Sequence, residues 1–561
     1  MTSVSFIGML WISAKRRQAM QKTGHQPTRY PAAVLVLLAE TTSRFATIDW
    51  VIVVAYLAVV ILIGFLAARK RLAAKSGDDF FLAGKSMPMW AVAISILATA
   101  QSAATFVGAP QEAYAGNLTY LATNIGPILA AIVVATLFIP AFYRHGVTSV
   151  YELIGHEMGS GAQRMASLMF MLGRVLASGA RLFIVAIPFS LVAFGDIEPP
   201  HLVLSIVIVA AVATAYSMAG GIRAVIWTDV IQVIVYLTCI CLALALIWQK
   251  IPLDAAGIIE LLRTHDESSP DAEDKLLLID ASFNISNPYT IWSSLIGITL
   301  LMIAAYGADQ DLTQRMLTCR SSRAASGSVI LATVIGLPVV FIFLVMGLLL
   351  WVFYTQPEVM GAAAPQYNVS DSRRVFIDFI LNEMHAGVRG LMMAGLFAAA
   401  MSSMDSGLNA MSSTTVADFY RPWRAKRTPN PPIGDRTERR MARLASLFWA
   451  CMISGFACLC IWWQAASGDT LIRFALGVMT YAYSGLLGVF FTALLTNRGN
   501  AASAVGAMIA GIIVVGMTDP LVWSHIASLI QTDVQPAFTW RLVLGTIASV
   551  SVCLMGDRPK R

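Results

Sequence analysis

The sequence predicts an all-α membrane protein that crosses the bilayer many times, and three observations support this class. Hydrophobic residues make up 57% of the 561 residues. Charged residues make up only 13%, about half of the share usual in soluble domains. The apolar residues also come in blocks of about 20, the length that a helix needs to cross the hydrocarbon core. Together these features exclude a soluble enzyme, a disordered chain and a secreted disulfide scaffold.

About 13 transmembrane helices are expected, and most of them are rich in Leu, Val and Ile. The expected spans cover residues 47–68, 88–112, 118–142, 165–193, 201–217, 222–247, 289–313, 327–354, 388–418, 443–463, 471–495, 501–519 and 539–556. The tail that precedes them, residues 1–46, is expected to be disordered, because its apolar piece is too short to span and it lacks the ordered regions of a signal peptide.

Lys and Arg residues concentrate in alternate connections between these spans. One set of connections, with the C-terminal end, holds 23 of them, and the opposite set holds seven when the tail is left out. Because positively charged loops stay in the cytoplasm, the C-terminus is expected inside the cell and the N-terminus outside. The same distribution explains the net charge of +7 without nucleic acid as a partner. We expect the protein in the cell membrane (plasma or inner membrane), with lipids around its helices.

The second span departs from the Leu-rich pattern. Residues 98–105 are nearly all small or carry a hydroxyl group, and Gln101 lies among them. Small side chains allow two helices to pack closely. Alternatively, the helix is interrupted here and frees backbone carbonyls that coordinate a cation or a solute. The residues alone leave both interpretations open.

The ninth span places hydroxyl groups and an acid deep in an apolar helix. Ser402, Ser403 and Ser406 surround Asp405 within about one turn. Hydroxyl and carbonyl oxygens are suitable ligands for a hard cation such as Na⁺. Serine hydroxyls also bond to the preceding turn of their own helix, but this does not explain Asp405, whose burial costs at least ~2.5 kcal/mol. A cation site is therefore expected here.

Two arginines and a further acid lie within other spans. Arg174 and Arg181 are seven residues apart in the fourth span, so they share a helix face. Asp229 lies near the cytoplasmic end of the sixth span, where a structural and a functional role are equally plausible. The arginines either pair with Asp229 or Asp405, or one of them binds an anionic solute. We favour an internal pair for Arg174 and leave Arg181 open.

Three motifs resemble the sodium:solute symporter family, and the resemblance runs from about residue 46 to 500. They are GGIRAVIWTDVIQ at 220–232, Ala308-Asp309-Gln310-Asp311 with Gln314-Arg315, and the Ser402-Ser403 segment that ends in Asp418-Phe419-Tyr420. The family implies a LeuT-like fold with two inverted five-helix repeats, broken helices at the midplane and alternating access.

The resemblance divides the chain into five parts. They are the tail 1–46, an extra first helix at 47–68, a first repeat at 88–247, a second repeat at 289–495 and two additional helices at 501–556. The implied function is secondary active transport, in which Na⁺ flows inward together with a small organic solute.

For the common sodium site of the family, the resemblance implies five residues of this chain. Their groups are the backbone carbonyls of Ala98, Gln101 and Ala399 and the hydroxyls of Ser402 and Ser403.

Sialic acid transporters of the family imply a second cation site. It maps onto Asp229, Ser402, Asp405 and Ser406. The family has a serine where this chain has Asp405, so the second site would hold two carboxylates. Because two carboxylates repel each other, we expect either a second Na⁺ or a proton (H⁺) between them, unless Asp405 pairs with an arginine of the fourth span.

The substrate positions resemble the vitamin, monocarboxylate and sialic acid branch. Proline carriers have an acid, and sugar carriers an asparagine, where this chain has Ala100. The implied substrate-binding residues are Ala100, Ser102, Thr105, Tyr120, Asn124 and Arg181. With Arg181 as a carboxylate partner, the expected solute is an organic anion.

Two other functions stay open at this point: a transporter-like sensor without transport, and symport of a neutral amino acid or sugar. The chain ends a few residues after the last expected span, where a signalling domain would follow in a sensor. An enzyme is not expected, because the seven Cys and seven His residues lack metal-ligand spacing and no nucleophile–base pair or cofactor motif is found. The solute, the Na⁺ stoichiometry and the oligomeric state are not set by the sequence.

Overall fold

The computed structural model describes residues 45–69, 82–217, 221–263, 274–367, 369, 371–427, 436–532 and 534–558. Helices dominate these residues, and no β-strand occurs within them. The tail that is expected to be disordered lies, except for its last two residues, outside the described part, as does Gly220 of the first motif.

The helices of the first half follow the expected spans. The chain opens with α3 (Thr47–Arg69) and η2 (Ala83–Lys85). The predicted first repeat contains α5 (Met89–Ala100), α6 (Ala103–Ala115), α7 (Thr119–Ala122), α8 (Ile125–Val133), η3 (Val134–Phe138), α9 (Ile139–His145), α10 (Val150–Met158), α11 (Ser160–Ala193), α12 (Pro199–Ser217) and α13 (Ile222–Lys250). A connecting helix, α14 (Ala255–Arg263), follows.

The second half has the same succession of long and short helices. It contains η4 (Ser293–Ile298), α15 (Thr299–Ile303), η5 (Ala304–Ala308), α16 (Gln310–Leu317), α17 (Ser322–Thr355), α18 (Pro357–Met360), η6 (Gly361–Ala363), η7 (Ser372–Arg374), α19 (Val375–Glu383), α20 (Val388–Thr414), η8 (Thr415–Tyr420), α21 (Arg421–Ala425), α22 (Arg436–Ser467) and α23 (Leu471–Leu495). The last elements are α24 (Ala501–Met517), α25 (Pro520–Ile530) and α26 (Phe538–Leu554).

Each of the expected spans overlaps one of these helices. In the described part, 7 helices are long and apolar enough to cross a membrane, or up to 10 if each bent pair is one span. Shorter apolar stretches occupy α3, α12 and α26. Length and composition therefore support a many-spanning helical protein, and the full count of thirteen stays a prediction.

Two long helices are broken in the middle of the bundle. The axis bends by 58° between α5 and α6, and by 56° between the segment 293–308 and α16. At the first break the hydroxyl of Ser102 accepts a hydrogen bond from the backbone N–H of Ala104 (3.2 Å) and so caps α6. At the second, Asp309 caps α16 by accepting from the N–H of Asp311 (2.8 Å). Each break lies in the first span of a predicted repeat.

These breaks decide between the sequence-based interpretations. The interruption of the second span is confirmed at Gln101–Ser102. The seventh span was expected over 289–313, and the structure divides it at Asp309, which ends one helix and starts the next. The ninth span is one continuous helix through Ser402–Ser406.

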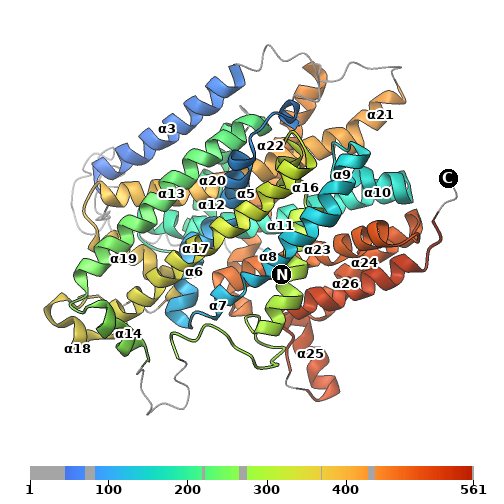
Figure 1. Cartoon of the computed structure of the whole chain (residues 1–561). Coiled ribbons are helices and arrows are strands. Elements are labelled where there is room, and N and C mark those ends of the chain that lie inside the picture. Colours follow the sequence, from blue (N-terminus) through green and yellow to red (C-terminus); the bar gives the residue numbers. More distant parts are fainter. Residues whose placement is uncertain are drawn as a thin grey trace, which may run out of the picture. The chain divides into compact units, whose positions relative to one another are not determined.

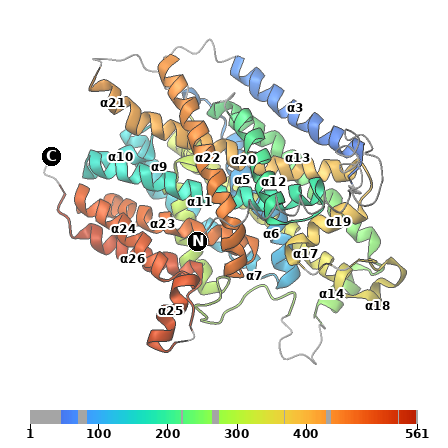
Figure 2. The same cartoon turned by 180° about the vertical axis from the view of Figure 1, so that it is seen from behind.

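The arrangement of the helices places α20 at the centre. Of the most apolar part of the span Val388–Ala425, 94% is buried by other helices, so its polar side chains do not face lipid. Figures 1 and 2 show α3 along one edge of the bundle, and α24 and α26 side by side along another.

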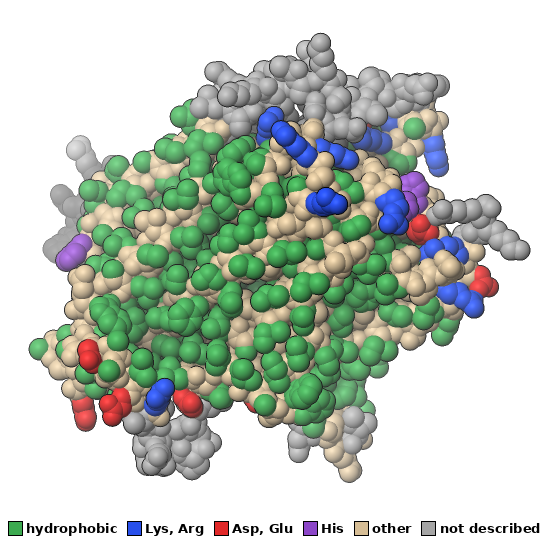
Figure 3. Space-filling view, in the orientation of Figure 1, with side chains coloured by type: hydrophobic (Ala, Val, Ile, Leu, Met, Phe, Trp, Pro, Cys, Tyr) green, Lys and Arg blue, Asp and Glu red, His purple; other side chains and the backbone are tan. Residues whose placement is uncertain are grey.

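Side chains of different type occupy different zones of the surface. Figure 3 shows a broad hydrophobic band, with Lys and Arg gathered at one end of the visible face and several Asp and Glu at the opposite end. Exposed basic residues include Arg144, Arg320 and Lys426, and exposed acidic residues include Asp254, Glu260 and Glu358. The band is what a bilayer would cover.

Candidate functional site

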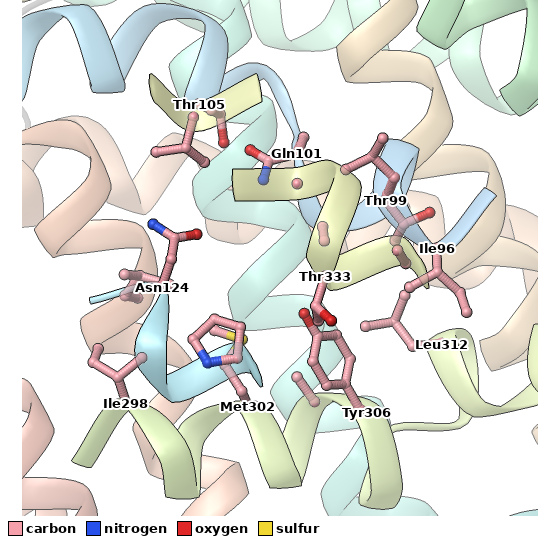
Figure 4. Close-up of a pocket in the computed structure, with 18 of the residues that line it drawn as sticks. Ile96, Thr99, Gln101, Thr105, Asn124, Ile298, Met302, Tyr306, Leu312 and Thr333 are labelled. Carbon is pink, nitrogen blue, oxygen red and sulfur yellow. The ribbon is translucent and has the colours of Figure 1, made fainter. Parts of the chain in front are cut away.

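A central cavity lies beside the two breaks. It has a volume of about 110 Å³, enough for several water molecules. Its walls come from α5, α6, α7, α8, α11, α17, α23 and the segment 293–312. Figure 4 shows Gln101, Thr105 and Asn124 on one side of it, and Met302 and Tyr306 opposite them. The site is thus formed by both halves of the chain.

Most of the implied substrate-binding residues meet in this cavity. The lining includes Ala100, Thr105, Tyr120, Asn124 and Arg181. The sixth residue, Ser102, is not part of the lining, because its hydroxyl is used to cap α6. This separation follows from the break itself, which makes Ser102 the N-cap residue of a new helix.

Arg181 is a cation of the cavity wall that has no acid beside it. It lies on α11, and no described acid comes within 4 Å of its guanidinium. Its Nη1 atom is buried and makes no hydrogen bond. Arg181 as a whole is half-buried, and because a buried donor without a partner is costly, this geometry suits an anion in the cavity.

Arg174 lies seven residues earlier on the same face of α11, and both of its terminal nitrogens, Nη1 and Nη2, are paired. It forms ion pairs with Asp311 through Nη2 and with Asp309 through Nη1 (3.5 Å), and it donates to the carbonyl of Ser403 (3.3 Å). The preference for an internal pair is therefore confirmed, but its partners are not the two acids that were expected. Gly407 makes room for this contact, since a Cβ there would lie 2.8 Å from Arg174 Nε.

A second, much smaller cavity is lined by four of the five residues implied for the common sodium site, and Ser403 is not part of its lining. Its lining includes Ala98, Gln101, Ala399 and Ser402, and its volume is about 10 Å³, close to that of one water-sized sphere. The hydroxyls of Ser402 and Ser403 are buried and form no hydrogen bond of normal geometry. Unpartnered buried oxygens are what a Na⁺ ion requires of its ligands.

The backbone around this small cavity also suits a cation. Ala98 lies in the last turn of α5, where carbonyl groups lack a donor from a following turn. Ala399 lies within the continuous α20, so its carbonyl keeps only its second lone pair for a ligand. The residues present therefore fit one Na⁺ ion.

Two of the four side chains implied for the second cation site, those of Asp229 and Ser406, are already engaged. Asp229 pairs with Arg315 (3.3 Å) and accepts a hydrogen bond from Ser95 (2.5 Å). Ser406 donates to Asp311 (3.2 Å) and to the carbonyl of Ser403 (3.2 Å). Asp405 is 4% exposed, and it forms no ion pair within 4 Å in the part of the chain that the structure describes.

Another ion pair, between a buried acid and a partly exposed arginine, lies next to the central cavity. Glu112 of α6 pairs with Arg473 of α23 (3.6 Å) and accepts hydrogen bonds from Tyr289 (3.2 Å) and Thr470. The ring of Tyr289 packs edge-on against Tyr120, a residue of the cavity wall. This cluster joins α6 to α23 next to the cavity.

Sequence reasoning missed the role of the acids and the arginine around the second break. Asp309 and Asp311 neutralise Arg174, and Asp311 also binds Arg315. The available signal was the high density of charge in the ADQD and QR motif within an apolar span. Tyr306 and Thr333, which line the central cavity, carried no such signal.

Comparisons with known proteins agree with this geometry. The profile of the sodium:solute symporter family matches residues 80–512. A sodium/sialic acid symporter of Proteus mirabilis is 29% identical over 483 residues, which cover 84% of this chain and 89% of that protein. A sodium/sialic acid symporter of Aliivibrio fischeri is 26% identical over 473 residues, covering 84% and 87%.

A solved structure has the same fold. It is the substrate-bound, outward-open state of a Na⁺-coupled sialic acid symporter, with a TM-score of 0.74 and 24% identity. The match covers 92% of this chain and 100% of that chain. It shows that the described helices form the LeuT-like architecture.

Proposed function

This chain belongs to the sodium:solute symporter family, and from that premise we infer that its central cavity carries a small organic anion. The protein is an integral membrane transporter that couples solute movement to Na⁺, and it is not an enzyme. The observation that carries the choice of an anion is Arg181, a half-buried arginine of the cavity wall whose Nη1 atom is buried without a hydrogen-bond partner.

The rest of the wall supports a hydroxylated or carbonyl-bearing anion. Thr105, Tyr120 and Asn124 supply hydrogen-bonding groups near Arg181, and Ala100 leaves space beside them. Arg181 would hold a carboxylate through two parallel N–H donors. Similarity to sialic acid symporters supports this class, because sialic acids are carboxylates that carry hydroxyl groups.

The Na⁺ ion that drives transport is proposed to bind in the small cavity. Its ligands would be the carbonyls of Ala98, Gln101 and Ala399 and the hydroxyls of Ser402 and Ser403. This cavity and the central cavity share Leu97 and Gln101 at the end of α5. The ion and the solute would therefore both contact the break between α5 and α6, which couples their binding.

Orientation and organisation are proposed from charge and from the two breaks. The end with exposed Arg and Lys would face the cytoplasm together with the C-terminus, and the end with Asp254 and Glu358 would face outward, in the cell membrane. Two repeats at 88–247 and 289–495 would each begin with a broken helix. The helix 47–68 and the pair within 501–556 would be additions to this core.

A thermal-shift screen of the purified protein tests the proposed substrate class. Organic acids that include sialic acid, neutral sugars and amino acids are each added with and without Na⁺. A bound solute raises the melting temperature by mass action. We expect stabilisation by carboxylates only, and larger stabilisation with Na⁺ than with K⁺. Uptake of the stabilising acid into proteoliposomes should then require an inward Na⁺ gradient. Stabilisation by neutral sugars alone would contradict the anion proposal.

A further inference from the structure

Gln232 is a buried amide in the wall of the small cavity. It lies on α13 and is 2% exposed. Its Oε1 and Nε2 atoms are both buried, and neither forms a hydrogen bond of normal geometry with any residue that the structure describes. Burying an amide without partners is costly, so such a group marks a place where a water molecule or an ion binds.

The small cavity brings this amide together with the residues of the proposed Na⁺ site. Its lining includes Ala98 of α5, Ala399 and Ser402 of α20, and Gln232 of α13. The cavity volume is about 10 Å³, close to that of one water-sized sphere. A single occupant would therefore contact groups from all three helices.

The chemistry of the amide suits Na⁺. An amide oxygen is uncharged, carries two lone pairs and is a ligand that hard cations accept. Such cations take about six oxygen ligands, and the site proposed above supplies three carbonyls and two hydroxyls. The hydroxyl of Ser402, in the same wall, also lacks a hydrogen bond of normal geometry among the described residues. One cation could take an oxygen from each of these groups.

The extra first helix, α3, packs behind this part of the site. The hydroxyl of Tyr56 on α3 is buried and lies beside the amide of Gln232. Four residues later, Val60 is 1% exposed and packs against Met401, the residue before Ser402. The helix thus supports both α13 and α20 where they reach the small cavity.

The first turn of α20 is also held by α3. Asp49 Oδ1 accepts hydrogen bonds from the backbone N–H groups of Gly387 (2.6 Å) and Gly390 (2.9 Å). Such groups at the start of a helix have no acceptor within the helix itself. A Cβ at Gly390 would lie 2.6 Å from the Cα atom of Asp49, so the two backbones are in close contact. The position of α20 therefore depends on α3 at two points.

We propose that Gln232 supplies a further oxygen ligand, Oε1, to the Na⁺ ion of the small cavity, and that Tyr56 holds this amide in place from α3. The inference rests on the proposed Na⁺ site at Ser402 and Ser403. Nε2 of Gln232 would donate to the Tyr56 hydroxyl, which leaves Oε1 for the ion. A helix outside the two predicted repeats thereby takes part in Na⁺ binding.

Equilibrium binding of radioactive sodium to the purified full-length protein tests the ligand role. Gln232→Met and Gln232→Leu remove the amide at similar size, and the Kd for Na⁺ should rise about five- to hundred-fold. Gln232→Glu keeps an oxygen at this position and should bind Na⁺ at least as tightly as the unaltered chain. The control is Thr238→Val on the same helix, which removes a hydroxyl that donates to the carbonyl of Ile234 (2.8 Å). Its Na⁺ affinity should change less than about twofold.

A double-mutant cycle tests the positioning role of Tyr56. Tyr56→Phe should weaken Na⁺ binding about two- to tenfold in the unaltered chain. It should have no further effect in Gln232→Met, because it acts through the amide. The melting temperature in K⁺ is measured for each variant. Gln232→Met should be at least as stable as the unaltered chain there, because it removes a buried amide without partners.

The outcomes separate this inference from the proposed function. Unchanged Na⁺ affinity in a folded Gln232→Met or Gln232→Leu variant would overturn the ligand role and leave the proposed Na⁺ site intact. Gln232→Glu binding as weakly as Gln232→Met would overturn it as well. Equal effects of Tyr56→Phe in both backgrounds would overturn the positioning role. No bound Na⁺ in the unaltered chain would overturn the proposed site itself.

Discussion

Single residues of α20 show how tightly the site is built. Gly407 has no side chain, and the space that a Cβ would take is filled by Arg174 Nε at 2.8 Å and by Ser178 Oγ at 3.1 Å. The glycine is needed for close approach, since it lets a buried guanidinium reach Asp309 and Asp311 past the helix backbone. The hydroxyls of Ser402 and Ser403, about one turn earlier, are buried and form no hydrogen bond of normal geometry.

Replacing Ser402 or Ser403 by alanine should weaken Na⁺ activation of transport. Losing one ligand oxygen in a buried site costs on the order of 1–3 kcal/mol, so the half-maximal Na⁺ concentration should rise roughly five- to hundred-fold. The measurement is initial uptake rate against Na⁺ concentration. The matched control is Ser413→Ala on the same helix, whose hydroxyl bonds to the carbonyl of Ala410 (2.8 Å). If both site variants behave like the control, these serines are packing residues.

Replacing Arg181 by lysine should weaken solute binding while leaving folding nearly unchanged. Lysine keeps the charge but lacks the planar pair of donors, and a drop in affinity of about tenfold or more is expected. Arg181→Gln, which removes the charge, should lose more. Arg323→Lys is the control for replacing arginine by lysine, because Arg323 is exposed on the surface. Solute affinity and melting temperature are measured together, and equal misfolding of both Arg181 variants would assign the residue a structural role instead.

At the residue scale, the sequence identified several side chains of the site, but it did not identify which of them contact one another. A buried Asp405 and two arginines on one face of α11 were readable, because charge in an apolar span is conspicuous. The partners of Arg174 were not, since Asp309 and Asp311 lie on a different helix and no local pattern encodes that contact. Ser102 was expected at the solute, but capping of α6 uses its hydroxyl.

At the scale of helices, close crossings hold the broken segments in place. The long helix α17 packs against α6, and Gly347 lies at their crossing. A Cβ at Gly347 would lie 2.3 Å from the carbonyl oxygen of Pro110 and 2.8 Å from Ala113 Cβ. The carbonyl oxygen of Pro110 belongs to the backbone, so it cannot move aside unless α6 itself shifts.

The variant Gly347→Ala should therefore lose stability, by about 1–3 kcal/mol as in other overpacked cores. Its melting temperature in detergent should fall clearly below that of the unaltered protein. Gly455→Ala is the matched control, because this glycine also lies in a long helix and a Cβ there meets no atom within 4 Å. Equal melting temperatures for the two variants would mean that the crossing of α6 and α17 is looser than the structure shows.

The two breaks were predicted unequally well. The run of small and hydroxyl residues at 98–105 made an interruption one of two open interpretations. The break at Asp309 was missed, because the segment before it is apolar and the acids after it looked like the end of a span. The local sequence does mark this break, because Asp309 is a favourable N-cap residue and a short polar helix follows it.

At the scale of the whole molecule, the expected spans agree with the observed helices. The thickness of the bilayer sets the length of a membrane-spanning helix, and an apolar segment of that length is visible in the sequence. The short helix α25, bent by 72° from α24, was not expected, since its apolar residues have no length requirement of that kind. The distribution of charge predicts which end faces the cytoplasm, and the basic end of the described surface supports it.

Cysteine labelling tests this orientation. In a background that lacks the seven native cysteines, Lys426→Cys should react with an impermeant maleimide only after the membrane is opened. Glu358→Cys, at the opposite end, should react in intact cells. Both positions are exposed, so access to the reagent is limited only by the membrane. Labelling of Lys426→Cys in intact cells would reverse the proposed topology.

Arg315 binds Asp229 and Asp311 and is part of the chain, so the bound solute and the Na⁺ ions set the charge that is carried across the bilayer in each cycle. One Na⁺ carried with one singly charged anion would move no net charge, and accumulation of the solute would then follow the sodium concentration ratio alone. Each additional Na⁺ would add about 2.3 kcal/mol of driving force for every 100 mV of membrane potential. The number of Na⁺ ions per cycle therefore decides whether depolarising the membrane slows the carrier.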